Sequence, residues 1–548
     1  MNFKRKLWWA QHKNDVYKYS TFILLFLVVT ISIIYFTYSK FSSSNEFTVY
    51  ETTVDPFIKN DYFIASYIDG EWSNEIPGKN DGYIVDKIVC DNGATGTWNY
   101  SKWSIEIENA TKKTKCSLFF VMGSLIDVEL YQGLIPVTYN SSGDVVVADT
   151  NTKWYDYSNH EWANAVLVNC ADSTIKSKYF NDDMSLKSSA VGSTISMDEI
   201  LQMYVYIPRY RYKLFNANNG TSNEHAIDII FEKVGTEKSN GTENGEWLTH
   251  PAFTFGNTEL PGIWVGKFEA SGTTDNYTIK PNLKSLTNIN ISTMFNTSRD
   301  VTNTKTITYG TDSNTSDSHM MKNMEWGAVA YLTNSIYGRY NDASTCIASG
   351  CEVWINNINT GYGNGTAVSG QPQWGPSITG CAGTSTSAGV SSSHTACASG
   401  YDWKTKGVNA STTGNQYGIY DMSGGAWEYV MGVQKDSSGN VQVGSSGFST
   451  SSLPDSKYYD LYDYQAEDGV GYTRYHLGDA TREVLKNTSS QGGNAWWSDY
   501  SYNIYSSAPW VDRGGGYYGG SCAGVFHFSR NNGWSDTGDS FRSVLTAN

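Results

Sequence analysis

One apolar segment near the N-terminus constrains the topology of this chain more than any other feature. Residues Thr21 to Tyr38 (TFILLFLVVTISIIYFTY) contain no charged side chain. As a helix rising about 1.5 Å per residue, the segment would cover roughly 27 Å, which matches the hydrocarbon core of a bilayer. Basic residues outnumber acidic ones before it, beginning with Lys4, Arg5 and Lys6. The positive-inside rule therefore predicts a single-pass cell-membrane protein, with a cytoplasmic tail at 1–20, a transmembrane helix at 21–38 and an extracellular C-terminal part.

A cleaved signal peptide is a competing interpretation of this segment, and a buried helix of a soluble protein is another. The run is long for a signal peptide, and the SKFSSSNEF that begins at Ser39 offers no small-residue cleavage motif. It is also apolar on every face, whereas a surface helix has one polar face. We therefore expect an uncleaved anchor that is followed by a spacer at 39–46.

The exported part is predicted to contain several β-rich units. A length of 548 residues exceeds one typical domain, and 52 glycines with 14% aromatic residues favour short strands, many turns and long loops. The formal net charge of −15 argues against a nucleic-acid partner, since binding phosphates requires clustered Lys and Arg. We expect a small β-domain at 47–120, a β-rich linker module at 121–195 and a larger domain at 196–548.

Local patterns predict individual elements within these units. Apolar and polar residues alternate in GYIVDKIVC (82–90), WSIEIENA (103–110) and MYVYIPRYRYKLF (203–215), which is typical of strands. The best helix candidate after the anchor is MEWGAVAYLTNSIYG (324–338). The Gly-, Ser- and Thr-rich residues 341–415 contain four cysteines and indicate a long insertion held by disulfides.

The eight cysteines indicate a disulfide-bonded protein rather than a metal centre. An even number of cysteines in an exported chain favours disulfides, and no C-x-x-C motif or neighbouring His suggests a zinc site. Proximity in the sequence predicts the pairs Cys90–Cys116, Cys346–Cys351 and Cys381–Cys397, and leaves Cys170 and Cys522 unassigned. The spacing alone does not determine the connectivity.

The segment NQYGIYDMSGGAWEYVMG (415–432) closely resembles the signature of formylglycine-generating-enzyme (sulfatase-modifying factor) domains. Further matches follow the order of that family: HPAF at 250–253, WVGKFE at 264–269, RGGG at 513–516 and SFRSVL at 540–545. The resemblance covers roughly 196–548. It implies an α+β fold with a C-type-lectin-like C-terminal domain, which small β-rich modules and the N-terminal transmembrane helix would precede.

The same segment suggests a calcium site. Asp421 and Glu428 place two carboxylates in one compact loop, and calcium prefers oxygen ligands. The resemblance implies one calcium ion held by these two side chains and by the backbone carbonyls of Gly424 and Ala426. In the alternative interpretation, both acids accept hydrogen bonds from backbone amides and bind no metal.

The oxidase chemistry of that family is not expected here. It requires two cysteines that bind copper(I), and their positions fall at Gly519 and Gly524 in this sequence. Cys522 lies between them. We therefore predict no copper site and no catalytic residue. An oxidoreductase that uses Cys522, alone or with Cys170, stays open as an alternative, and a structural envelope protein is a second one.

The C-terminal residues 510–545 suggest ligand binding. Tyr, Ser, Asn, His and Asp on the loops of a rigid scaffold are typical of recognition surfaces. The segment is also similar to the variable region of C-type-lectin-fold proteins that diversity-generating retroelements target, which implies a diversified surface. The predicted function is thus a membrane-anchored, receptor-like or adhesin-like protein for a protein or glycan ligand. The candidate ligand-binding residues are Tyr517, Tyr518, Ser521, Cys522, His527, Ser529, Asn531, Asn532, Ser535, Asp536, Thr537 and Asp539.

Overall fold

The computed structural model describes residues 62–68, 70–73, 76, 83–99, 104–111, 114–122, 126–360, 362–363, 366–367, 375–389, 396–397 and 399–548. The chain divides into two units at Tyr62, and the first unit lies outside the described residues except for its last one. The predicted tail, transmembrane helix and spacer therefore lie outside them as well.

The first described strands form a small β-module. A four-stranded sheet has the order β2-β1-β6-β3, and β4 pairs with β5. Trp98 and Phe120 pack edge to face in its core, with ring centroids 5.4 Å apart. The Cys90–Cys116 disulfide joins β3 to β6, as the spacing predicts. The bounds are β1 Tyr62–Ile68, β2 Glu71–Trp72, β3 Tyr83–Cys90, β4 Thr95–Asn99, β5 Ser104–Glu108 and β6 Lys115–Met122.

A seven-stranded antiparallel sheet is the centre of the remaining chain, in the order β19-β27-β16-β10-β9-β7-β8. Its strands come from both ends of residues 126–548. Residues 121–195, predicted as a separate module, instead contribute β7, β8 and β9 to this sheet. The bounds are β7 Ile135–Tyr139, β8 Val145–Val147, β9 Asn164–Val168, β10 Ile200–Pro208, β16 Gly262–Gly266, β19 Ser316–Met320 and β27 Ser543–Ala547.

Burial on both faces explains the composition of the central strands. Every residue of β9 and β16 is buried, and their runs NAVLV and GIWVG lack the alternation of a half-exposed strand. Helix α5 (Asn323–Thr333) is also buried throughout, and its apolar residues surround the helix axis. Gly327 allows the close approach of α5 to a loop, because a Cβ there would lie 1.9 Å from the carbonyl oxygen of Gly478.

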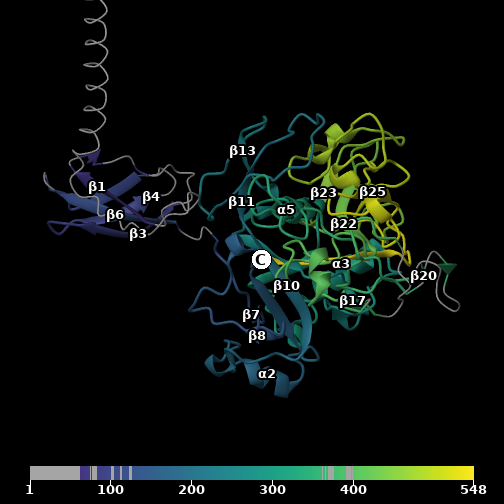
Figure 1. Cartoon of the computed structure of the whole chain (residues 1–548), viewed down its shortest axis with the longest axis horizontal. Coiled ribbons are helices and arrows are strands. Elements are labelled where there is room, and N and C mark those ends of the chain that lie inside the picture. Colours follow the sequence, from purple (N-terminus) through teal and green to yellow (C-terminus); the bar gives the residue numbers. More distant parts are fainter. Residues whose placement is uncertain are drawn as a thin grey trace, which may run out of the picture. The chain divides into compact units, whose positions relative to one another are not determined.

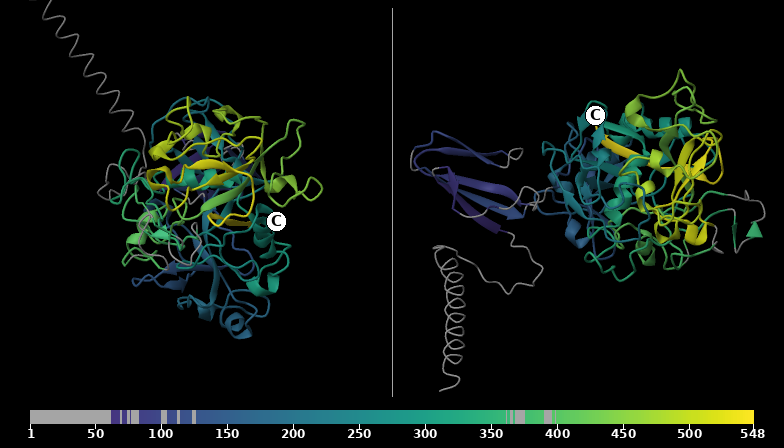
Figure 2. Two further views of the ribbon diagram at one scale, coloured as in Figure 1. Left: turned by 90° about the vertical axis from the view of Figure 1, so that its right-hand side faces the viewer. Right: turned by 90° about the horizontal axis from the view of Figure 1, so that it is seen from above.

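A second sheet carries the C-terminal residues. Its order is β23-β22-β24-β25, and β26 pairs with β22. Figure 1 shows the labelled strands of this sheet, in green and yellow, grouped apart from β7, β8 and β10, and the views in Figure 2 agree. The bounds are β22 Trp427–Gln434, β23 Asp460–Tyr462, β24 Trp510–Arg513, β25 Phe528–Asn531 and β26 Asp539–Phe541.

Short elements complete the described chain. The remaining strands are β11 Tyr210–Lys213, β12 Ile229–Phe231, β13 Trp247–Thr249, β14 Thr254–Phe255, β15 Thr258–Glu259, β17 Ser271–Gly272, β18 Tyr277–Thr278, β20 Tyr362–Gly363 and β21 Thr366–Ala367. The other α-helices are α2 Ser173–Tyr179, α3 Ile291–Asp300 and α4 Thr306–Tyr309. Single 3-10 turns are η1 Tyr157–Asn159, η2 Ser188–Ala190, η3 Pro251–Phe253, η4 Lys406–Ala410, η5 Ser456–Tyr458, η6 Tyr472–Arg474, η7 Arg482–Val484, η8 Trp496–Ser498 and η9 Gly520–Cys522.

The structure corrects the predicted fold class and localisation. Strands dominate the described residues, whose longest α-helix has 11 residues, so this part of the chain is mostly β rather than α+β. None of the helices described is both long and apolar enough to cross a membrane. The expected membrane localisation rested on residues 21–38, outside the described part, and nothing in the structure supports it.

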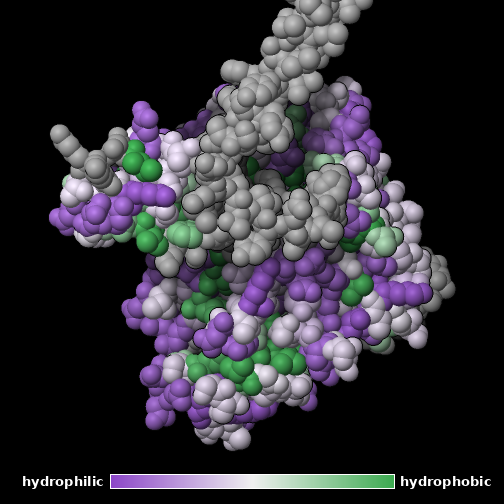
Figure 3. Space-filling model, turned by 60° about the vertical axis from the view of Figure 1, so that its left-hand side comes forward, coloured by the Kyte–Doolittle hydropathy of each residue, from purple (hydrophilic) through white to green (hydrophobic). Residues whose placement is uncertain are grey.

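The disulfide predictions are confirmed. Cys346–Cys351 and Cys381–Cys397 form within the predicted insertion, whereas Cys170 and Cys522 are free thiols. Cys170 is buried, and this burial raises the pKa of its thiol to about 11, which makes the nucleophilic thiolate rare at neutral pH. Among the coloured residues of Figure 3, hydrophilic ones cover most of the surface and hydrophobic ones form smaller areas.

Candidate ligand-binding surface

The predicted ligand-binding residues lie on and around a loop between two paired strands. Strands β24 and β25 pair antiparallel, from Trp510 opposite Asn531 to Arg513 opposite Phe528. The loop between them folds back sharply at Gly515, which has φ +72°. A Cβ at Gly515 would lie 2.8 Å from the Cα of Ala523, so only glycine lets the two sides of the loop approach this closely.

Three of the predicted contact residues are interior residues instead. Tyr517, His527 and Asp539 are 0%, 5% and 3% exposed. His527 is held by a 2.8 Å hydrogen bond between Nδ1 and the carbonyl oxygen of Cys522, and burial lowers the pKa of its imidazole to about 4. Asp539 accepts a 2.9 Å hydrogen bond from Asn531 Nδ2. Their packing under the loop explains why they do not face a ligand.

The other predicted residues do reach the surface. Tyr518 is 37% exposed, and its ring meets Trp427 edge to face at 4.8 Å between centroids. Exposed side chains are those of Ser521, Cys522 and Ser535, and half-buried ones are those of Ser529, Asn531, Asn532, Asp536 and Thr537. The predicted segment therefore combines exposed and buried side chains within a few residues.

Trp427 is a surface residue that the sequence patterns did not single out. It begins β22 and its ring is half-buried between two glycines. A Cβ at Gly516 would lie 2.8 Å from the indole ring, and one at Gly538 would lie 3.2 Å from it. The missing side chains of these glycines leave space for the indole ring, and the Tyr518 ring packs against it edge to face. The ring is therefore a fixed apolar platform at the surface.

A row of tyrosines packs against His527, at the C-terminal end of the same loop. Tyr500 stacks on His527 at 5.8 Å and on Tyr502 at 5.6 Å between ring centroids. The residues between the tyrosines point inward: Ser501 and Asn503 are both 0% exposed, and Asn503 Nδ2 donates to the carbonyl oxygen of Gly469 at 2.8 Å. This segment thus buries its polar side chains and turns its aromatic ones outward.

A charged side chain, that of Arg530, stacks on this row of tyrosines. The guanidinium carbon of Arg530 lies 3.6 Å from the ring centroid of Tyr502 and 5.2 Å from that of Tyr505. Arg530 also pairs with Asp468 at 3.2 Å, and the Tyr502 hydroxyl donates to the same carboxylate. Partial burial opposes ionisation of Asp468, yet these partners keep its pKa below the usual value. The Tyr502 and Arg530 side chains are therefore held in place by contacts within the protein.

We name the exposed and half-buried aromatic residues around this loop, with the arginine stacked on them, the C-terminal aromatic surface. Its members are Trp427, Tyr500, Tyr502, Tyr505, Tyr518 and Arg530. Trp534, which is 53% exposed, lies in the turn between β25 and β26. The alternating tyrosines in SDYSYNIY (498–505) were the sequence signal that could have identified half of this surface.

The residues of the predicted calcium site have protein partners. Asp421 accepts hydrogen bonds from Asn356 Nδ2 at 2.8 Å and from the Gly380 amide at 2.9 Å. Glu428 pairs with Arg542, whose guanidinium donates from Nη2 at 2.5 Å and from Nε at 3.1 Å. In the described residues, no group of three or more His, Cys, Asp or Glu side chains is arranged to hold a metal ion.

The backbone amides of Gly424 and Ala426 have partners within the protein, whereas the resemblance assigned their carbonyl oxygens to the ion. The Gly424 amide donates to the carbonyl oxygen of Gly514, and the Ala426 amide donates to Glu269 Oε1. A cation from the protein itself, Arg542, neutralises Glu428 where the resemblance implied a bound ion. Asp421 accepts a hydrogen bond from a backbone amide, as the alternative interpretation predicts, whereas Glu428 pairs with a guanidinium, and the calcium site stays a prediction.

Of the two positions of the family's cysteine pair, Gly524 has no room for a side chain and Gly519 is tightly packed. A Cβ at Gly524 would lie 2.1 Å from both carboxylate oxygens of Asp499, closer than any real contact. At Gly519 a Cβ would lie 3.1 Å from the carbonyl oxygen of Gly516. Asp499 is buried and its Oδ2 accepts a hydrogen bond from the Phe526 amide at 2.9 Å, so it cannot move away freely.

Part of this chain is similar to Treponema denticola variable protein 1. The two share 9% sequence identity, and the alignment covers 62% of this chain and 95% of that one, with a TM-score of 0.23. No known protein family matches the chain, and no curated protein does. The resemblance to formylglycine-generating-enzyme domains therefore stays a prediction.

Proposed function

We propose that this chain is a ligand-binding protein whose C-terminal aromatic surface binds a polypeptide. The observation that carries the proposal is the inverted pattern at 500–503, where Ser501 and Asn503 are buried while Tyr500 and Tyr502 lie outward. A segment that only needed to fold would place its rings inside, because burying aromatic area stabilises the fold. Their outward placement is explained by a partner that covers them.

The composition of the surface supports a polypeptide partner. Tyr, Trp and Arg are the residues that contribute most of the binding energy in protein–protein interfaces. Tyr502 and Arg530 are already ordered by Asp468, so little side-chain entropy is lost when a partner binds. The exposed Ser521 and half-buried Asn531 and Asn532 supply hydrogen-bonding groups beside the rings.

Selection from a peptide library displayed on phage tests this proposal. The purified chain is immobilised, and the selected peptides are then measured against Tyr502→Ala, Tyr518→Ala and a control variant. Tyr401→Ala is a matched control, because Tyr401 is also half-buried, stacked on Trp354 and approached by a cation, Lys406.

We expect the peptides to bind wild type and Tyr401→Ala equally and to bind Tyr502→Ala about tenfold more weakly, since a lost hot-spot contact costs at least about 1.4 kcal/mol. Equal binding to all variants would contradict the proposal. A second outcome would also contradict the proposal: no peptide is enriched, the chain binds glycans on an array, and Tyr502→Ala loses that glycan binding.

A further inference from the structure

A pocket on another part of the domain contains a largely buried lysine, Lys322, whose ammonium group forms no ion pair among the described residues. It is surrounded by β14, the first turn of α5 and η5, and its volume is about 590 Å³. Phe255, Lys322, Asp455, Lys457 and Asp460 are among the residues that line it. None of the lining residues belongs to the C-terminal aromatic surface, so the pocket would serve a separate ligand.

Lys322 is the residue that points to a ligand. It is 6% exposed, yet its ammonium group has no ion pair within the part of the chain that the structure describes. Its Nζ lies 5.6 Å from the centroid of the Phe255 ring. Lys is rarely buried unless it is paired, so an ammonium group that lines a pocket without an ion pair can pair with an anion there.

Two acids, Glu325 and Asp460, interact electrostatically with Lys322 without forming an ion pair with it. Glu325 accepts hydrogen bonds from the Lys322 amide at 2.8 Å and interacts with His319 at 3.0 Å. Asp460 accepts a 2.7 Å hydrogen bond from the Met324 amide at the start of α5. The backbone of Lys322 is thereby held at the helix N-terminus, while its ammonium group remains available to the pocket.

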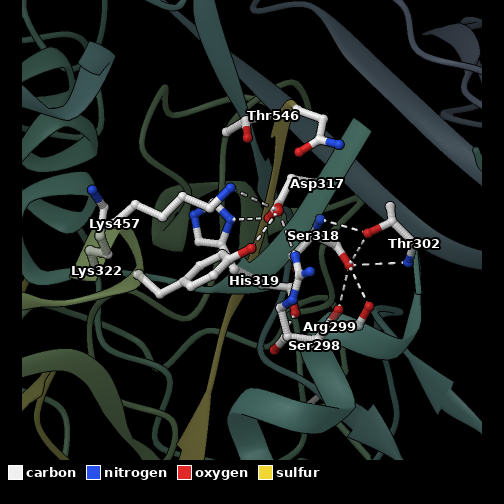
Figure 4. Close-up of polar contacts among 12 residues, drawn as sticks. Ser298, Arg299, Thr302, Asp317, Ser318, His319, Lys322, Lys457 and Thr546 are labelled. Carbon is white, nitrogen blue, oxygen red and sulfur yellow. Dashed lines mark hydrogen bonds and ion pairs between the residues drawn. The ribbon is translucent and has the colours of Figure 1, made fainter. Parts of the chain in front are cut away.

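Lys457 brings a second cation to the same ring. Its Nζ lies 4.5 Å from the Phe255 centroid and 3.7 Å from Asp317 Oδ2. Asp317 already has closer partners, with Arg299 at 2.6 Å, the Tyr458 hydroxyl at 2.7 Å and His319 at 3.1 Å. Figure 4 shows these groups converging on the Asp317 carboxylate. The network behind the pocket is therefore neutralised without Lys322.

The wall also carries groups that accept hydrogen bonds. Asp455 uses Oδ1 to accept the Lys457 amide at 3.0 Å, which leaves the second carboxylate oxygen for a donor in the pocket. Asp460 faces the same space. The two carboxylates would repel a doubly charged phosphate. A singly charged ligand with hydroxyl groups suits the pocket better, because its anionic group can pair with the lysines while its hydroxyl groups donate to the carboxylates.

We propose that this pocket binds a small hydroxylated carboxylate of the acidic-sugar class. The ligand carboxylate lies between Lys322 and Lys457, and the ligand hydroxyl groups donate to Asp455 and Asp460. A volume of about 590 Å³ is within the range of small-molecule sites and exceeds what one monosaccharide requires.

Calorimetric titration with glucuronate tests the site, with glucose as the uncharged analogue. The variants are Lys322→Met and Lys457→Met, which keep the aliphatic length and remove the charge. The matched control is Lys238→Met, because Lys238 belongs to the same region and is paired with Glu259 at 2.5 Å but does not line the pocket. Thermal unfolding of each variant shows that it is folded.

We expect glucuronate to bind wild type and Lys238→Met, glucose to bind neither, and Lys322→Met to bind glucuronate about tenfold more weakly or worse. Lys322→Arg should retain binding within a few-fold because it restores the charge. The proposal is overturned if glucuronate does not bind wild type at millimolar concentrations. It is also overturned if Lys322→Met binds it as well as wild type does, or if inorganic phosphate binds more tightly than glucuronate.

Discussion

At the scale of single residues, Gly524 illustrates how packing against a remote carboxylate restricts the side chain at one position. The Asp499 carboxylate occupies the space that a Cβ at position 524 would need, 2.1 Å from it. Burial raises the pKa of Asp499 well above its usual value, while the Phe526 amide holds it in place. This contact links η8 to the loop after β24, two segments that sequence patterns alone do not connect.

Replacing Gly524 with alanine should therefore destabilise the domain. We expect Gly524→Ala to lower the free energy of unfolding by about 1–3 kcal/mol, as overpacking does in well-packed interiors. Urea denaturation measures the change. Gly389→Ala is the control, because no atom lies within 4 Å of its added Cβ, and its stability should stay close to that of wild type. Equal stabilities of both variants would show that the Asp499 contact does not restrict position 524.

Glu483 predicts a pH dependence of stability. Burial raises the pKa of Glu483 to about 7, even though the Tyr212 and Tyr331 hydroxyls and the Gly478 amide donate to it. The folded chain therefore holds this proton to higher pH than the unfolded chain. Its contribution to stability is complete below about pH 4.5 and is lost as the pH rises through about 7.

The variant Glu483→Gln removes this titration. Between pH 5 and 7 its free energy of unfolding should fall less steeply than that of wild type, by up to about 1.4 kcal/mol per pH unit. Urea denaturation at several pH values provides the slopes. The exposed Glu243→Gln should follow wild type. A wild-type slope in Glu483→Gln would assign the pH dependence to other buried carboxyls.

At the scale of elements, the tyrosine row separates binding from stability. The buried Ser501 and Asn503 should contribute more to the stability of the fold than the half-buried Tyr500 and Tyr502. We expect Asn503→Ala to lower the free energy of unfolding by about 1–2 kcal/mol, because the carbonyl oxygen of Gly469 loses one of its two donors and keeps only Gln491 Nε2 at 2.7 Å. Tyr502→Ala should change it by less, since its ring is half-buried. Thermal unfolding checks both, and the reverse order would mean that the tyrosines are core residues.

Elements with a strong local period were predictable from the sequence. The pattern at 203–215 became β10 and β11, and the helix expected at 324–338 became α5 at Asn323–Thr333. The helix ends earlier than predicted because Asn334 and Ser335 turn the chain, with the Ser335 hydroxyl donating to the Leu332 carbonyl oxygen. The tyrosine row was missed because its alternation is inverted, with polar residues inward.

At the scale of the whole molecule, the seven-stranded sheet determines which fragments can fold. Strand β9, which precedes the predicted boundary at 196, pairs along β10. We expect a fragment of residues 126–548 to unfold cooperatively, because its core cluster contains no residue of the small β-module. A fragment of 196–548 should aggregate or unfold without cooperativity, since it exposes the β10 edge and loses three strands. Circular dichroism during heating distinguishes the two, and cooperative unfolding of the shorter fragment would contradict this prediction.

The sequence by itself determined what depends on near neighbours: three disulfides between cysteines close in the chain, strands and one helix with a clear period, and a C-terminal segment rich in recognition residues. Only the tertiary structure decided which of those residues face outward. Tyr517 and Tyr518 are adjacent and chemically identical, yet the first is buried and the second lies against Trp427 at the surface. Burial is set by segments distant in the sequence, such as the Gly425 carbonyl that accepts the Tyr517 amide, and no local pattern encodes such contacts.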